Sequence, residues 1–132
     1  MIPGIVWPQL TGNISDMLAT LRATERLTRS QVQDGQLSQL RSLAAHAREQ
    51  TTWGRRHLPD VLTWESFQAL PILDRTFVQS HAQELCAAQW PAEHGPAHEV
   101  VTSGSTGTPV RVLKSRLVAG LWQSVTARDH VW

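Results

Sequence analysis

Helical periodicity dominates the first ninety residues of the chain. Apolar residues recurring at intervals of three and four predict a first helix over residues 14–29. A second stripe predicts a helix over residues 36–50, and Gln33-Asp34-Gly35 breaks the pattern between them. We expect both stripes to be core faces, so that Leu40→Asp would unfold the helical part, because an unpaired buried carboxylate is costly. The stripes comprise Ile14, Met17, Leu18, Leu21, Leu37, Leu40, Leu43, Ala44 and Ala47.

Shorter elements follow before the composition changes. Residues 53–60 contain glycine, proline and paired arginines and predict a loop, whereas residues 63–71 predict a short helix. Asp74 is the expected N-cap of a further helix over residues 74–89. The prolines within residues 91–96 then mark a change from helices to strands.

Two short runs rich in valine enclose a loop of small residues. They predict the antiparallel strands of a hairpin over residues 98–114, with residues 103–109 at its tip. After the hairpin, Leu117, Leu121 and Val125 fall on one face of a predicted helix. The expected class is α/β, and α+β within these residues: a helical segment, then a β-hairpin, then a helix.

The hairpin loop has the composition of a phosphate-binding loop. Its glycines allow close backbone approach, and its exposed N–H and hydroxyl groups are donors suited to an anion. A Walker A loop is excluded, because no Lys-Ser/Thr pair follows a Gly-x4-Gly spacing and a strand-like run follows. Ordinary hairpin turns use the same residue types, so that alternative stays open. The candidate binding residues are Thr102, Ser103, Gly104, Ser105, Thr106, Gly107, Thr108 and Pro109.

The run TSGSTGTPV at residues 102–110 resembles the glycine-rich phosphate-binding signature of adenylate-forming (AMP-binding) enzymes. This superfamily includes acyl- and aryl-CoA ligases, luciferases and peptide-synthetase adenylation domains. Residues 70–78, LPILDRTFV, resemble an element that the branch of phenylacetate-CoA ligase and coenzyme F390 synthetase carries before its loop. Many relatives have lysine or arginine at the position of Thr108 and lysine at that of Arg75.

The resemblance implies part of a larger adenylate-forming N-terminal domain. Residues 1–96 would form a helical N-terminal subdomain, and residues 97–132 would begin the nucleotide-binding core. The implied reaction is ATP-dependent activation of a small carboxylic acid, with Mg²⁺ and ATP as cofactors and CoA as the expected thiol acceptor. In relatives the adenine, ribose, metal and lysine motifs follow the loop, so we expect an N-terminal piece that is inactive alone and needs the missing C-terminal part.

Within the loop, the resemblance and the donor chemistry assign roles to six of the eight candidate residues. Ser103, Ser105 and Thr106 are the expected hydroxyl donors and Gly104 and Gly107 the backbone hinges. Thr102 either contacts the nucleotide or supports the residues that do. No residue of this chain is assigned a catalytic role. The run Arg55-Arg56-His57 could meet a CoA phosphate, although a solvated loop face is the favoured alternative.

Charge and cysteine content exclude several other classes. A net charge of +1 is too small for counterion-driven nucleic-acid binding. Cys86, His94 and His98 lack zinc-site spacing, so no metal site is expected. No apolar run approaches the ~20 residues needed to span a membrane, the first residues lack a secretion signal, and a lone cysteine fits a reducing compartment. We therefore expect a cytoplasmic protein without membrane association.

A second function class stays open beside the ligase. Charged residues make up 17% of the chain and six tryptophans are present, which indicates surfaces that further sequence or a partner covers. The alternative is a non-catalytic helical interaction or docking module whose Gly/Ser/Thr hairpin is structural. The four tryptophans Trp53, Trp64, Trp90 and Trp122 are expected to be packing anchors.

Overall fold

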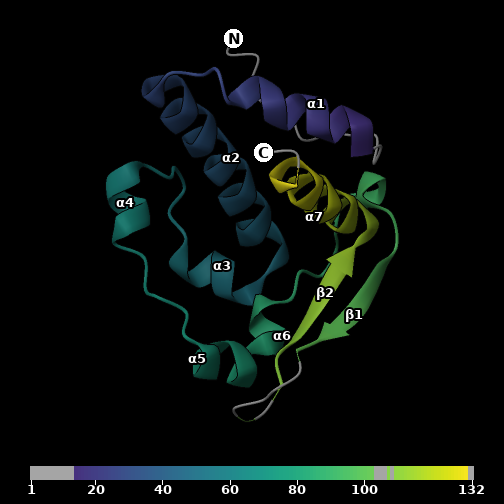
Figure 1. The fold of residues 1–132 in the computed structure, drawn as a ribbon. Coiled ribbons are helices and arrows are strands. Elements are labelled where there is room, and N and C mark those ends of the chain that lie inside the picture. Colours follow the sequence, from purple (N-terminus) through teal and green to yellow (C-terminus); the bar gives the residue numbers. More distant parts are fainter. Residues whose placement is uncertain (1–13, 103–106, 108, 131–132) are drawn as a thin grey trace. The chain divides into compact units, whose positions relative to one another are not determined.

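The computed structural model describes residues 14–102, 107 and 109–130, which form helices and one two-stranded antiparallel sheet (Figure 1). The predicted α+β class is therefore confirmed. The elements are α1 (Ile14–Thr24), α2 (Arg29–Gln50), α3 (Thr52–His57), α4 (Trp64–Gln68), α5 (Arg75–Ser80), α6 (Ala82–Leu85), the 3-10 helix η2 (Ala92–His94), β1 (Ala97–Val101), β2 (Arg111–Ser115) and α7 (Arg116–Asp129).

The chain divides into two compact units, each assembled from separate segments of sequence. The first consists of the described residues up to Gly35, Pro91–His98 and those from Leu113 onward. The second consists of Gln36–Trp90 and Glu99–Val112. The subdomains predicted over residues 1–96 and 97–132 stay predictions.

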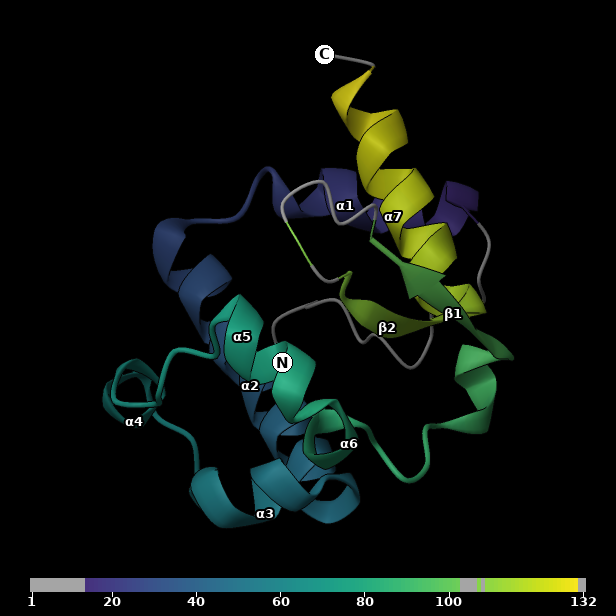
Figure 2. The same ribbon diagram turned by 90° about the horizontal axis from the view of Figure 1, so that it is seen from below.

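The first unit is built on the packing of α1 against α7, which lie side by side in both ribbon views (Figures 1 and 2). Met17 on α1 is 1% exposed and Ser124 on α7 is 0% exposed. The Ser124 hydroxyl donates to the Gly120 carbonyl, 2.9 Å away, so its burial leaves no polar group unpaired. Met17 of the apolar stripe predicted for α1 is thus a core residue, and Leu18 and Leu21 are half-buried.

The first two helices begin and end elsewhere than predicted. α1 stops at Thr24, and α2 starts at Arg29 and runs through Gly35, so the predicted break at 33–35 is wrong. The cause is a capping box: the Thr28 N–H donates to Gln31 Oε1 (2.9 Å), and the Gln31 N–H donates to the Thr28 hydroxyl (3.3 Å). This box sets the start of α2 and outweighs the modest helical cost of one glycine.

The contrasting environments of two helical glycines give a test of this fold. Nothing lies within 4 Å of a Cβ placed on Gly35, so Gly35→Ala is expected to raise the free energy of unfolding by roughly 0.5–1 kcal/mol. Gly54 is buried, and a Cβ there would overlap the Ala47 carbonyl and lie 2.7 Å from the Thr51 hydroxyl oxygen. Gly54→Ala should therefore lower that free energy by about 1–3 kcal/mol.

Urea unfolding followed by circular dichroism measures both variants against the parent chain. The changes in the free energy of unfolding of the two variants are expected to have opposite signs. A loss of stability in Gly35→Ala would contradict an uninterrupted α2, since alanine is favourable only where the backbone is helical.

The second unit has a small core beneath the C-terminal half of α2. Trp53 and Leu62 are buried, as is Ala44 on α2. The Arg41 guanidinium donates to the Leu62 carbonyl at 2.8 Å, and Arg48 forms an ion pair with Asp60, so α2 holds the segment that follows α3.

Helix α3 corrects the loop predicted over residues 53–60. Thr51 ends α2 by donating its hydroxyl to the Ala47 carbonyl, and the same oxygen accepts from the Gly54 N–H; both distances are 2.8 Å. That side chain is the N-cap of α3, whose residues place Trp53 in the core and stack it on His57 at 5.0 Å. The glycine and arginines therefore lie in a helix, because an effective cap begins one there.

The helix predicted over residues 74–89 is two helices. Asp74 caps α5 as predicted, its carboxylate accepting from the Phe77 N–H at 2.7 Å. The backbone then leaves helical geometry at His81, between α5 and α6. The His81 ring stacks on Phe77 with 4.1 Å between centroids, and its Nδ1 lies 3.2 Å from the Phe77 carbonyl oxygen. The contact between the His81 ring and the Phe77 carbonyl oxygen therefore occurs where the helix breaks.

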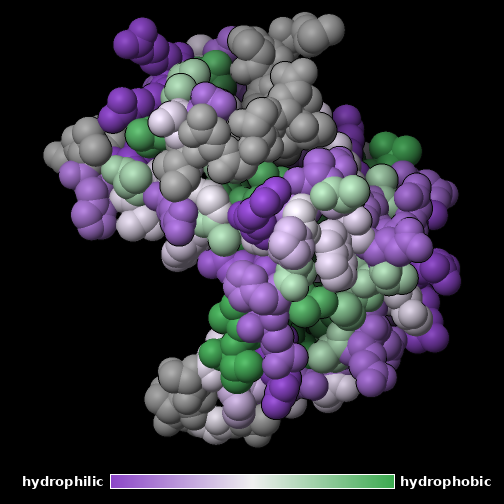
Figure 3. Space-filling view, turned by 90° about the vertical axis from the view of Figure 1, so that its right-hand side faces the viewer, coloured by the Kyte–Doolittle hydropathy of each residue, from purple (hydrophilic) through white to green (hydrophobic). Residues whose placement is uncertain are grey.

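Large apolar side chains remain at the surface, and the space-filling view shows hydrophobic atoms among hydrophilic ones (Figure 3). Two tryptophans predicted to be packing anchors, Trp90 and Trp122, are exposed, whereas Trp53 is buried as predicted. On α2, Leu40 is half-buried and Leu43 is exposed, so only part of the second predicted stripe is a core face. The exposed large residues are Leu43, Val61, Phe67, Ile72, Trp90, Val101, Val112, Leu113, Val118 and Trp122.

Candidate functional site

The candidate site is the loop between β1 and β2, which pair with each other as the predicted hairpin does. Below the loop, Thr102 and Val110 face each other. The Thr102 N–H donates to the Val110 carbonyl at 3.0 Å, and the Val110 N–H donates to the Thr102 hydroxyl oxygen at 2.9 Å. Two hydrogen bonds therefore close the base of a seven-residue loop, and the Thr102 hydroxyl has a structural task as an acceptor.

Only part of the candidate loop belongs to the described residues. Thr102, Gly107 and Pro109 are described, and all three are exposed. Gly107 has φ +142°, a conformation that residues with a Cβ rarely adopt, and nothing lies within 4 Å of a Cβ placed there. Its role as a backbone hinge of a phosphate loop stays a prediction. The other candidates, Ser103, Gly104, Ser105, Thr106 and Thr108, lie outside the described residues.

A charged pair lies just below the loop. The Arg111 guanidinium on β2 lies 2.8 Å from the Glu99 carboxylate on β1, and both side chains are substantially exposed. This pair is not among the site residues predicted from the sequence. The available signal was the placement of opposite charges on two strands predicted to pair, since such cross-strand partners attract.

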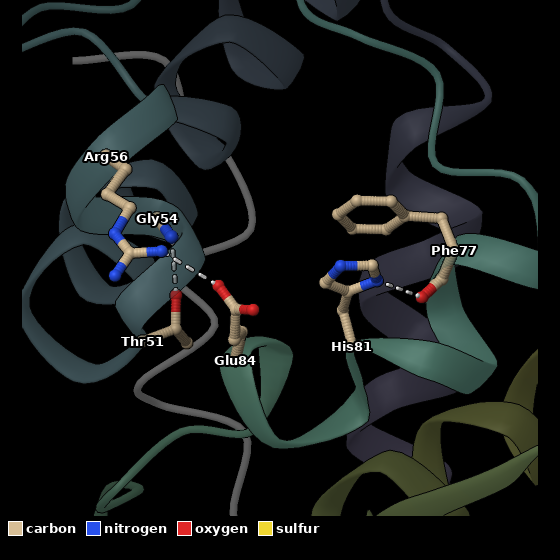
Figure 4. A network of polar contacts seen from close by, with 6 residues as sticks. All are labelled: Thr51, Gly54, Arg56, Phe77, His81 and Glu84. Atoms are coloured by element: carbon tan, nitrogen blue, oxygen red, sulfur yellow. Dashed lines mark hydrogen bonds and ion pairs between the residues drawn. The ribbon is translucent and has the colours of Figure 1, made fainter.

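The Arg55-Arg56-His57 run lies on α3, so the favoured loop placement is wrong. Arg56 forms an ion pair of 3.2 Å with Glu84 of α6, and Figure 4 shows this pair beside the Thr51 cap of α3. Arg55 donates to the Glu49 carbonyl at 3.3 Å. These contacts connect α3 to neighbouring elements of the second unit, and none of them selects a phosphate ligand.

An open groove of about 410 Å³ lies on the second unit between α2 and α4. Leu40, Leu43 and Trp64 form its apolar lining, and Gln36 and Gln39 contribute amides. Phe67 meets Trp64 edge to face with 6.2 Å between ring centroids. The groove carries no charged lining residue, so its chemistry differs from that of the hairpin loop.

Two other kinds of feature are absent from the described residues. No group of three or more histidine, cysteine, aspartate or glutamate side chains there could hold a metal ion. None of the helices in residues 14–102 and 109–130 is both long and apolar enough to cross a membrane. Cys86, for its part, is exposed.

Comparisons with known proteins add no assignment to this geometry. No family model, no curated protein and no solved structure matches the chain.

Proposed function

We propose that this chain is the N-terminal part of an ATP-dependent carboxylate-activating ligase, in which the hairpin holds the phosphates of the nucleotide. The observation that carries the proposal is the paired hairpin itself, with Gly107 at φ +142° in a loop of serine, threonine and glycine. A loop of this kind presents consecutive N–H groups and hydroxyls to an anion without bulky side chains in the way. The resemblance of residues 102–110 to the adenylate-forming signature supplies the reaction class.

The chemical task of the loop is to stabilise charge on the leaving phosphates. When a carboxylate attacks the α-phosphate, negative charge builds on the departing pyrophosphate, and donors already in place stabilise it without rearranging. Ser103, Ser105 and Thr106 would donate their hydroxyl protons. Thr102 accepts from the Val110 N–H and so holds the base of the loop.

The side chains fit some of the implied ligands better than others. Neutral N–H and hydroxyl donors fit the phosphate oxygens of ATP, which are acceptors. In adenylate-forming relatives the carboxylate that binds Mg²⁺ follows the loop, and no group of three or more His, Cys, Asp or Glu side chains among the described residues could hold a metal ion. We assign no metal ligand in this chain. CoA would accept the acyl group by thiol attack, and no residue of this chain is assigned to it.

Binding of inorganic tripolyphosphate tests directly whether the hairpin loop holds phosphates. Titrating the 132-residue chain with it should shift the backbone amide NMR signals of Thr102, Gly107 and Val110, because these residues form or close the loop. Sulfate at matched ionic strength is the control and should shift them far less. ATP–pyrophosphate exchange by the chain alone, with a panel of aryl and short acyl acids, should stay at background. Unmoved hairpin signals would show that the loop is a structural turn.

A helical interaction module is the second candidate function. The exposed apolar side chains favour it, in particular Leu43 and Phe67 beside the groove between α2 and α4. Apolar patches of this kind mark contact surfaces in many proteins. Under this alternative the hairpin binds nothing, so tripolyphosphate would leave its amide signals unchanged.

A further inference from the structure

The Arg111 side chain is directed away from the loop that precedes it in the sequence, toward Glu99. Since Thr102 pairs with Val110, Val101 lies opposite Arg111, and Glu99 lies one step further from the loop on the same face. The guanidinium reaches along this diagonal and meets the Glu99 carboxylate at 2.8 Å. Arg111, the cationic residue nearest to the loop in sequence, is thus paired with Glu99 on the side of the hairpin away from the loop tip.

This ion pair is easily broken. The Arg111 side chain is 68% exposed and that of Glu99 is 48% exposed. Ion pairs so open to water add little to stability, because solvent screens the attraction and two long side chains lose freedom. A ligand with a denser negative charge can therefore take the guanidinium from Glu99 without unfolding the hairpin.

Arg111 is also the fixed cation that this part of the chain offers to a phosphate. Between residues 99 and 112 the charged residues are Glu99 and Arg111 alone. Two residues of extended chain span at most about 7 Å, so Arg111 starts that close to Pro109, a distance comparable with the length of its own side chain. A guanidinium can bind two phosphate oxygens at once, which neutral loop donors cannot match in charge.

We propose that Arg111 is a phosphate-binding residue of the hairpin and that Glu99 is its resting partner. In the free protein the guanidinium pairs with Glu99. When a polyphosphate enters the loop, the guanidinium changes partner and turns toward the phosphate oxygens. This inference rests on the proposed function, because it requires the loop to hold phosphates, and it adds a binding residue outside the loop.

The test compares tripolyphosphate affinity in four forms of the chain: the parent, Arg111→Gln, Glu99→Gln and the double variant. Arg111→Gln is expected to weaken binding by roughly tenfold or more, as for a lost hydrogen bond to a charged group. Glu99→Gln should tighten binding about twofold to fivefold, because it removes an exposed competitor for the guanidinium. When Glu99→Gln is added to Arg111→Gln, the affinity for tripolyphosphate should change little.

The double variant separates competition from simple repulsion. Glu99 also repels an anion directly, and that effect would tighten binding equally with or without Arg111, whereas competition requires the arginine. Arg111→Lys keeps the charge and loses the two-pronged geometry, so its affinity should fall between those of Arg111→Gln and the parent. Thermal unfolding of each variant should stay close to that of the parent, since the pair is exposed.

Each outcome decides between named possibilities. If the parent binds tripolyphosphate and Arg111→Gln binds it equally well, Arg111 is not a ligand, while the phosphate loop stands. If Glu99→Gln tightens tripolyphosphate binding equally in the parent and in Arg111→Gln, Glu99 does not compete with the ligand for Arg111. The proposed change of partner is then overturned. If the parent shows no binding at all, the proposed function fails and this inference fails with it.

Discussion

Replacing Thr106 with valine should slow adenylation by roughly tenfold to a thousandfold in a ligase that contains this hairpin, as for the loss of one donor to a transition-state charge. Valine has nearly the volume of threonine and lacks the hydroxyl. The apparent affinity for the carboxylic acid should barely change, because the loop binds the leaving phosphates. Single-turnover measurement of pyrophosphate release reports the adenylation step separately from thiol transfer.

Gly107→Val is the companion variant and should slow adenylation further. At φ +142° a β-branched residue is strained, so the loop would have to change its backbone. The site is exposed and a Cβ there meets nothing within 4 Å, so the helices should keep their circular dichroism spectrum and melting temperature. Parent rates in both variants would reduce the loop to a hairpin turn and leave the interaction module as the better explanation.

Met17→Asp is expected to unfold the first unit. Met17 is 1% exposed in the helix that packs against α7, and burying an unpaired carboxylate costs several kcal/mol, a large share of the stability of a small domain. The loss should appear as a lowered melting temperature or as absent helical signal in circular dichroism.

Two further substitutions serve as controls for Met17→Asp. Met17→Leu keeps an apolar side chain of similar volume and should cost less than about 1.5 kcal/mol. Leu40→Asp, which the sequence pattern predicts to unfold the helical part, should be milder than Met17→Asp, because Leu40 is half-buried and lines an open groove. A Leu40→Asp variant less stable than Met17→Asp would contradict this placement of the core.

The elements that the sequence predicts well are those with a strong local signal. The two valine-rich runs around a loop of small residues predict the hairpin, and Asp74 predicts the start of α5. Helix ends are harder to predict from the sequence, because glycine and charged residues suggest a break even where a nearby capping box starts a continuous helix. Thr28 with Gln31 has the spacing of a capping box, and recognising it would have placed the start of α2 correctly.

Other features depend on contacts that sequence periodicity does not encode. The break at His81 coincides with stacking on Phe77 and a contact with its carbonyl, whereas the apolar spacing runs on through both helices. The exposure of Trp122 and Leu43 depends on tertiary packing, and a period of 3.6 residues marks a face without saying what covers it. In the candidate site, the closure by Thr102 and Val110 follows from strand pairing, and the roles of residues 103–106 and 108 still rest on residue chemistry.

The exposed position of Cys86 makes the chain easy to label at one place. It is the single cysteine of the sequence, and its thiol is open to solvent just beyond α6. A maleimide dye or spin label should therefore attach with one-to-one stoichiometry and without prior unfolding. The same thiol can join two copies of the chain through a disulfide in air, so samples for the binding titrations should be kept reduced.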